Sequence, residues 1–351
     1  YPHAYRDHWV AQQYLPNALQ GRVFYQPSPV GYEGHIQQSV MRRREEQLAA
    51  MLEGGCGAVE VLTYGPLDRE SERWLARTIS NAAQELAIVR ERLFAALAMR
   101  RHDLVLDLHA GTGLLTWEAL RRAPEGGVWA LCRDAEAALA LRQQAEALAE
   151  LTRPTVLQGR LAELPVLLAA ADHGDVRFDA GRGRNSVVDE PDKGAAAALL
   201  AGLLRPGGAL SLAEAVPRHA QRLYALVDLA PLGDELAAAL GEAEEAIYRQ
   251  ADDPMVNWDA EDLADALRAA GLEVVALNVA ETASERLISD RQLARWFERG
   301  AGPRPSYADH LARRLTAEQV DMVQDLYRRN LLRRTVPWRG RVAYLAARRC
   351  P

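Results

Sequence analysis

The stretch Asp107-Leu108-His109-Ala110-Gly111-Thr112-Gly113 joins a short apolar run at residues 104–108 to a helical pattern that continues to about Arg121. Glycines at such a strand-to-helix turn let a ligand approach the backbone closely, and the start of the helix offers free N–H groups to polar atoms. Ligands of open α/β sheets bind outside the carboxyl ends of the strands, beside a loop of this kind. The stretch therefore predicts a ligand-binding loop, although a tight turn without a ligand would also favour Gly111 and Gly113.

Apolar runs alternate with helical segments on the carboxyl side of this loop. Strands are predicted at 104–108, 128–132, 155–158, 177–181, 209–214, 272–280 and 341–347. Helices are predicted between them, including 193–204, 260–270 and a charged helical stretch at 290–334, and residues 71–99 are expected to form one or two more. This alternation is typical of an α/β fold, a parallel sheet with helices on both faces and right-handed crossovers.

Bulk properties narrow the class of protein. A chain of 351 residues predicts two units, or one domain with appendages. No run of about 18 apolar residues occurs, so no membrane span is expected. The net charge of −6 argues against the whole chain as a nucleic-acid footprint, but it leaves room for a local basic patch. Cys56, Cys132 and Cys350 are too scattered for a disulfide framework or a zinc site, which fits a reducing cytoplasm and predicts no metal.

A nicotinamide dinucleotide is the first rival ligand for the glycine loop. Its fingerprint requires a third glycine or alanine three positions after the second, and Thr116 stands there. A dinucleotide oxidoreductase is therefore disfavoured, and NADH binding tighter than that of another cofactor would revive it.

The loop resembles the first motif of class I methyltransferases that use S-adenosylmethionine (SAM), in which an acidic residue precedes a Gly-x-Gly. Asp107, Ala110, Gly111 and Gly113 match this motif, and Leu204-Arg205-Pro206-Gly207-Gly208 matches the turn that precedes the fifth strand in the family. The resemblance covers about residues 103–349. It implies a Rossmann-like, seven-stranded, mostly parallel sheet whose last strand is antiparallel, with SAM as the cofactor.

Carried over residue by residue, the resemblance exposes departures from the family pattern. His109 stands where the family usually has glycine, Cys132 where an acid binds the ribose hydroxyls, and Arg160 where an acid often faces the adenine amine. Cysteine cannot accept two hydroxyl hydrogen bonds, so either Asp134 substitutes or ribose binding is weak, and arginine has no acceptor for the amine. The candidate cofactor contacts are Asp107, His109, Ala110, Gly111, Thr112, Gly113, Cys132, Arg133, Asp134, Gly159, Arg160 and Asn185.

No catalytic residue is predicted, because residues 178–185 lack both the Asn/Asp-Pro-Pro-aromatic tetrapeptide and the Pro-Cys nucleophile of the DNA-base methyltransferases. For each remaining candidate, the structural interpretation competes with the functional one. His109 is expected to cap or pack rather than catalyse. Among Asp189, Glu190 and Asp192, which could face the pocket, Asp192 is expected to cap the next helix. Arg182 and Arg184 are expected at the pocket mouth, drawing an anionic substrate, or on the surface. The turn at 253–258 is expected to pack rather than act as a lid.

Residues 1–47 differ in composition from the rest of the chain. Seven of the 22 aromatic residues fall within the first 32 positions, among several prolines, and a solvated linker is poor in aromatics. The pattern, which includes Tyr1-Pro2-His3, His8-Trp9-Val10, Gln12-Gln13-Tyr14-Leu15-Pro16, Phe24-Tyr25 and Gly31-Tyr32-Glu33, resembles the extreme C-terminus of the clamp-loader-like AAA+ ATPases called replication-associated recombination protein A (RarA, or MgsA). The resemblance implies an ATPase with an appended methyltransferase-like domain, working at stalled replication forks and in DNA repair.

The expected organisation is an ATPase tail at 1–47, a helical linker at 48–102, and a methyltransferase-like domain at 103–349 with a helical insertion at about 290–335. The phosphate-binding loop G-x-x-x-x-G-K-[ST] is absent, so this chain is not expected to hydrolyse ATP. The expected partners are the ATPase domain of the full-length protein and, through it, DNA or replication proteins. A homo-oligomer is also implied by the ATPase family.

Two functions remain open from the sequence. The first is an active SAM-dependent methyltransferase acting on nucleic acid or protein, which Asp107, Gly111 and Gly113 favour. The second is a degenerate methyltransferase fold that serves as a binding or scaffold module of the ATPase, which Cys132 and Arg160 favour.

Overall fold

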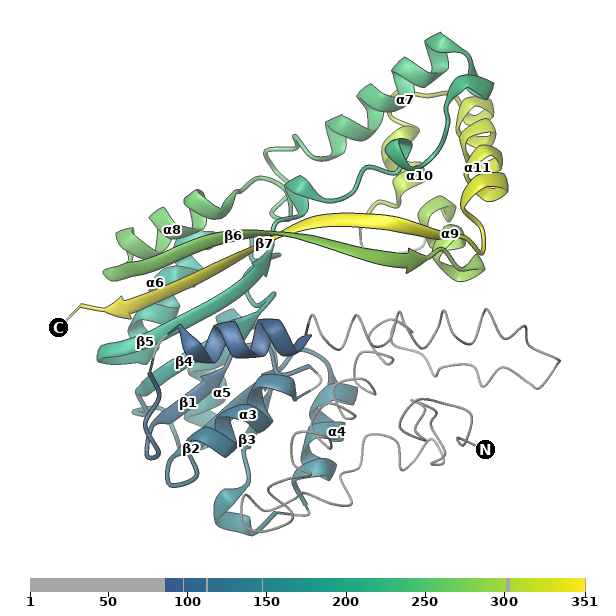
Figure 1. Ribbon diagram of the computed structural model, residues 1–351. Helices are drawn as coiled ribbons and strands as arrows, with labels where there is room; N and C mark the ends of the chain where they lie inside the picture. The colour runs from purple at the N-terminus through teal and green to yellow at the C-terminus, as the bar shows by residue number, and fades with distance from the viewer. Residues whose placement is uncertain (1–85, 97, 112, 147, 301–303, 351) are drawn as a thin grey trace.

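The computed structural model describes residues 86–96, 98–111, 113–146, 148–300 and 304–350 (Figure 1). The predicted ATPase tail and most of the predicted linker, as well as the candidate contact Thr112, lie outside the described residues. Within the described part, residues 86–95 form a helix, which agrees with the helical pattern expected there.

Seven strands form one sheet in the order β3-β2-β1-β4-β5-β7-β6, and β7 alone runs in the direction opposite to the other six (Figure 1). The strands are β1 (Leu104–Asp107), β2 (Gly127–Cys132), β3 (Thr155–Gln158), β4 (Phe178–Arg184), β5 (Leu204–Ala215), β6 (Leu272–Leu287) and β7 (Thr335–Arg349). The predicted mostly parallel sheet with an antiparallel last strand is confirmed. The chain crosses over between β1 and β4, so the carboxyl end of β1 is the switch point where such sheets bind ligands.

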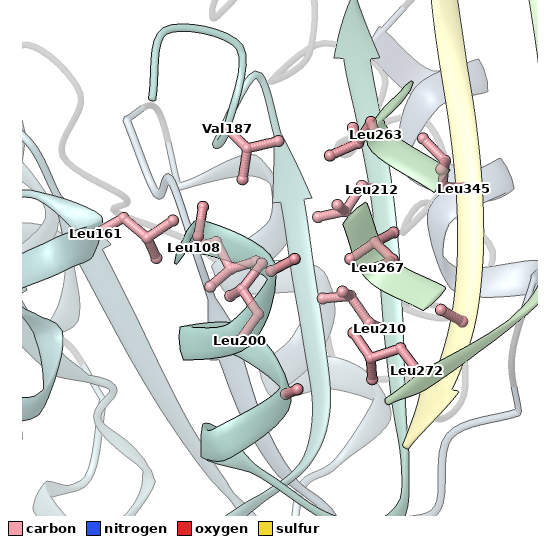
Figure 2. Packing of buried hydrophobic residues seen from close by; sticks show 14 of the residues in the cluster. Leu108, Leu161, Val187, Leu200, Leu210, Leu212, Leu263, Leu267, Leu272 and Leu345 are labelled. Carbon is pink, nitrogen blue, oxygen red and sulfur yellow. The ribbon is translucent and has the colours of Figure 1, made fainter. Parts of the chain in front are cut away.

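Helices cover both faces of the sheet because alternate strand residues are apolar on each side. On β1, Leu106 contributes to a core shared with α5 (Leu164–Ala170), α6 (Lys193–Leu203) and α8 (Ala260–Ala269), part of which Figure 2 shows. Val105 points to the other face, into a core shared with α3 (Leu114–Arg122) and the helix at 86–95. Helix α4 (Ala135–Ala145) contributes to a third apolar cluster, together with β2.

The structure differs from the predicted strand lengths at three places. The predicted turn at 205–208 lies inside β5, where Gly207 has a φ of 75°. Strand β4 continues to Arg184, beyond the predicted end at residue 181. Strands β6 and β7 extend past the sheet as a two-stranded ribbon in which Glu281 to Leu287 pair with residues 335–341.

The ribbon leads to a second, helical unit, which we call the cap. It contains α7 (Asp234–Ile247), α9 (Asp290–Phe297), α10 (Tyr307–Leu311) and α11 (Ala317–Leu331), with a hydrophobic core of its own. Strands β5 and β6 run into the cap and β7 leaves it, so the cap stands on the side of the carboxyl ends of β1–β5 (Figure 1). Short 3₁₀ turns lie at Glu150–Thr152, Leu161–Glu163, Pro217–His219, Tyr224–Leu226 and Ala230–Leu232. Among the described residues, no helix is long and apolar enough to cross a membrane.

Candidate cofactor site

Asp107 ends β1 with its carboxyl group buried beneath the loop, 1% exposed. Its Oδ2 accepts a 2.6 Å hydrogen bond from the Thr116 hydroxyl, and its Oδ1 accepts one of 3.2 Å from the His109 N–H. Burial raises the pKa of Asp107 to about 6, against these hydrogen bonds, which lower it. The carboxyl group therefore holds the loop to the start of α3 through these two hydrogen bonds.

The two glycines of the loop have different roles. Gly113 has a φ of 77°, and a Cβ there would lie 2.6 Å from the Trp117 Nε1, so the turn itself requires this glycine. At Gly111, no described atom lies within 4 Å of the position that a Cβ would occupy, and its φ is one that other residues adopt. Ala110 is buried against β2, to whose Leu131 carbonyl its N–H donates. Gly111 thus marks open space in front of the loop.

His109 connects the loop to the end of β4. Its Nδ1 lies 3.0 Å from the Arg184 carbonyl oxygen and 3.1 Å from that of Asn185, so Nδ1 carries the proton and Nε2 is the free acceptor. Burial and the charge of Arg133 lower the pKa of His109, which keeps its ring neutral at pH 7. Asn185, with a φ of 51°, closes the end of β4 through its side-chain oxygen, which accepts from the Ala215 N–H.

The end of β2 offers no free carboxylate at the position where the ribose was expected. Cys132 is fully buried, and burial raises the pKa of its thiol to about 12, so it stays protonated. Asp134 is exposed, and its Oδ1 accepts a 2.7 Å hydrogen bond from the Ala137 N–H as the N-cap of α4. Arg160 is also exposed, and its backbone N–H donates to Glu163. Gly159, beside it, donates its N–H to the Cys132 carbonyl.

Arg133 forms an ion pair that reaches across the end of β1. Its Nη1 lies 2.7 and 2.8 Å from the two carboxylate oxygens of Asp189, and its Nη2 donates to the Ser186 carbonyl at 2.9 Å. Burial opposes ionisation of Asp189, but the hydrogen bond and charge of Arg133 outweigh it and lower the pKa of Asp189. Because β1 lies between β2 and β4, this pair spans the carboxyl end of β1, where the loop begins.

Two charged side chains that the sequence analysis did not single out hold the segment after β4. Glu214, fully buried on β5, accepts hydrogen bonds from the Ser186 N–H and hydroxyl at 2.9 and 2.8 Å, and from the Val187 N–H at 3.2 Å. Lys193, the only lysine of the chain, donates to the carbonyls of Val188, Glu190 and Pro254. A glutamate inside the apolar run of β5 was the available signal for the first.

The structure also settles several side chains on which the sequence left alternatives. Arg182 is neither at a pocket mouth nor on the surface: it is fully buried, with its guanidinium 5.6 Å from the Phe94 ring, because residue 182 points to the sheet face that the helix at 86–95 covers. Asp192 is confirmed as the N-cap of α6. Trp258 is 2% exposed and donates to the Val188 carbonyl, which confirms packing. Glu190 is half-buried beside Arg133, and Arg184 is half-buried.

The strand order, the antiparallel β7 and the loop after β1 together define a class I methyltransferase fold. Residues 1–44 match the family described as MgsA AAA+ ATPase C terminal, in agreement with the aromatic and proline pattern of that segment. No curated protein matches the chain significantly.

Solved structures with this fold are similar to the chain at low identity. A candidate methyltransferase from Bacillus halodurans is 15% identical, with 76% of this chain and 100% of that chain covered and a TM-score of 0.44. Geranyl diphosphate methyltransferase with bound sinefungin is 13% identical, with 89% and 99% covered and a TM-score of 0.44. The mycolic acid cyclopropane synthase CmaA1 with S-adenosylhomocysteine is 13% identical, with 82% and 90% covered and a TM-score of 0.43.

Proposed function

We propose that this chain carries a SAM-dependent methyltransferase domain, with the cofactor over residues 107–113 and the methyl acceptor entering from the side of the cap. The observation that carries the proposal is the open space in front of Gly111, at the switch point of the sheet. Gly113 is explained by its turn, whereas nothing in the packing of the described residues requires a glycine at 111.

The residues fit the methionine half of SAM better than the ribose half. SAM supplies a methyl group on a cationic sulfonium, and the neutral ring of His109 places no charge of its own beside it. The start of α3 offers backbone N–H groups to a carboxylate. At the ribose position the buried Cys132 thiol replaces two strong acceptors with one weak one. We therefore infer that the cofactor binds more weakly than it would with a carboxylate at the ribose position.

In this proposal, the protein accelerates methyl transfer mainly by aligning the methyl donor and the methyl acceptor. Methyl transfer is an in-line displacement, and holding donor and acceptor in line removes much of the entropic barrier. Among the described residues of the loop, His109 is the one whose side chain can act as a base, because its Nε2 carries no proton. It could therefore take a proton from the methyl acceptor. The ion pair of Arg133 with Asp189 fixes the segment after β4 beside the reacting atoms.

The setting of this activity is part of the same proposal. The match of residues 1–44 to an ATPase C-terminal family supports a full-length protein in which the domain follows that ATPase. In that setting the methyl acceptor is nucleic acid or protein at replication and repair sites in the cytoplasm. The oligomeric state of the full-length protein is then set by its ATPase domain.

A second candidate function is a binding module without catalysis. Cys132 and Arg160 favour it, because both carboxylates that normally recognise adenosine are replaced. The two candidates differ in one measurable property, which is affinity for SAM.

Titration calorimetry with SAM and S-adenosylhomocysteine tests the proposal on three proteins. The unaltered chain is expected to bind both. Gly111→Ala is expected to bind at least tenfold more weakly with an unchanged melting temperature, because the added methyl group enters open space. The matched control Gly241→Ala on α7, also with nothing within 4 Å, is expected to bind like the unaltered chain. Absence of binding at millimolar SAM excludes the enzyme and leaves the binding module, and tighter NADH binding excludes both.

A further inference from the structure

Positive charge is concentrated where β6 ends and β7 begins. We call residues 285–299 and 333–341 the arginine tip. The tip contains eight arginines and three acidic residues, in a chain whose net charge is −6. The arginines are Arg286, Arg291, Arg295, Arg299, Arg333, Arg334, Arg339 and Arg341, and the acids are Glu285, Asp290 and Glu298.

Backbone hydrogen bonds and a ring contact bring these two segments together. The N–H of Ile288 donates to the Arg334 carbonyl at 3.1 Å, and the N–H of Arg333 donates to the Ile288 carbonyl at 2.8 Å. The Trp296 and Trp338 rings stack, with centroids 6.3 Å apart and planes 19° apart. Helix α9 therefore lies against the end of the ribbon, as Figure 1 shows.

Four of the eight arginines of the tip have no ion-pair partner among the described residues. Helix α9 buries Leu293 and Phe297, which leaves Arg291 and Arg295 exposed one turn apart. Within the part of the chain that the structure describes, no carboxylate lies within ion-pair distance of these two residues, nor of Arg334 or Arg339. A bias towards arginine codons would scatter this charge along the chain. Like charges gathered without counter-ions repel one another, and a bound anion would reduce this repulsion at the tip.

Flat rings accompany the charge. Trp296 and Trp338 are half-buried at the edge of the cap core, and the Arg286 guanidinium lies 4.3 Å from the Trp338 ring centroid. Arginines that follow a phosphate backbone, beside aromatic rings on which bases stack, are the chemistry of single-strand binding. We propose that the arginine tip binds single-stranded nucleic acid. This surface is separate from the cofactor loop, so binding is expected without SAM.

Fluorescence anisotropy of a labelled 20-nucleotide oligothymidylate, with the full 351-residue chain and no SAM, tests the proposal. The double variant Arg291→Glu with Arg295→Glu is expected to bind at least tenfold more weakly. The matched control is Arg177→Glu with Arg348→Glu, which changes the net charge by the same amount. Both positions are exposed and lie away from the tip, just before the start of β4 and near the end of β7. It is expected to bind within twofold of the unaltered chain.

Two further readouts separate base stacking from charge attraction. Intrinsic tryptophan fluorescence is expected to fall on binding. The duplex of the same length is expected to bind at least fivefold more weakly, because its bases stack on one another and cannot stack on the tryptophan rings. Affinity is expected to fall steeply with added salt. No binding, equal loss in both double variants, or equal competition by polyglutamate would overturn the proposal, and equal binding of the duplex would overturn its single-strand part.

Discussion

Cys132 is the residue of the proposed site whose replacement we expect to change cofactor affinity most. It is fully buried at the end of β2, and its thiol is protonated because its pKa is about 12. Replacing it with Asp places two carboxylate oxygens where the ribose hydroxyls are expected, and hydrogen bonds to a charged group contribute about 1.5–3 kcal/mol each. Burial of the carboxylate offsets part of this gain. Cys132→Asp is therefore expected to tighten SAM binding about tenfold in calorimetry.

Cys132→Ser is the matched control, because it keeps the size of the side chain and adds no charge. It is expected to change the Kd of SAM by less than threefold. If Cys132→Asp folds normally and leaves the Kd unchanged or weaker, the adenosine does not lie over the end of β2, and our placement of the cofactor is wrong.

Asp107 makes stability depend on pH in a specific direction. Its pKa rises from 3.8 to about 6 on folding, so the folded state holds the proton more tightly than the unfolded state does. The free energy of unfolding therefore falls as pH rises from about 4 to about 6, and the full penalty of about 3 kcal/mol persists above that range. Asp107→Asn removes the penalty. Chemical denaturation is expected to show the variant about 1–3 kcal/mol more stable than the unaltered chain at pH 8, and the difference is expected to shrink to about a third of that value at pH 4.5.

Thr116→Val provides the opposite change at the same site. It removes the hydroxyl that donates to the Asp107 carboxylate, so the pKa of Asp107 rises further. This variant is expected to lose more stability at pH 8 than at pH 4.5. A stability difference between Asp107→Asn and the unaltered chain that does not change with pH would show that Asp107 does not titrate in this range.

Lys193 links elements that are distant in the sequence. Its ammonium group donates to carbonyls of the segment after β4 and, through Pro254, to the turn that precedes α8. Lys193→Met keeps the stem of the side chain and leaves these carbonyls without their donor, at a cost of about 2–4 kcal/mol. Asp192→Ala, which removes only the neighbouring N-cap of α6, is expected to cost about 1 kcal/mol. Urea denaturation at pH 7 measures both, and a loss below 1 kcal/mol in Lys193→Met would contradict this role.

At the element scale, β1, β2 and the second half of β5 could be predicted from the sequence because each contains a short run buried on both faces. The outer halves of β6 and β7 could not, because beyond residue 280 they pair only with each other and carry exposed residues such as Glu281 and Arg339. The candidate site likewise contains features that the sequence predicts and features that it does not. The loop and the missing ribose carboxylate could be predicted, whereas the contact that distinguishes Gly113 from Gly111 depends on Trp117, and the partners of Glu214 lie on another strand.

The described part of the molecule divides into a sheet unit and a cap with separate hydrophobic cores, and the β6–β7 ribbon joins them. The sheet core includes Leu200 of α6, and the cap core includes Leu240 of α7. A buried polar network belongs to the cap alone: Glu244 accepts a 2.6 Å hydrogen bond from the Tyr307 hydroxyl, which lies 3.1 Å from that of Tyr327. Separate cores joined by a narrow connection are expected to open as separate cooperative units.

Hydrogen exchange measured by mass spectrometry tests this independence with one substitution in each core. Leu240 is fully buried and Leu200 is 2% exposed, so either Leu→Ala change removes about 2–5 kcal/mol from its own unit. Leu240→Ala is expected to speed exchange in α7, α10 and α11 while β1, β2 and β4 keep their protection, and Leu200→Ala is expected to do the reverse. Equal loss of protection in both units by either variant would mean that the cap and the sheet unfold as one body. The free energy of the cap then could not be separated from that of the sheet, and local opening of the cap alone would not admit an acceptor.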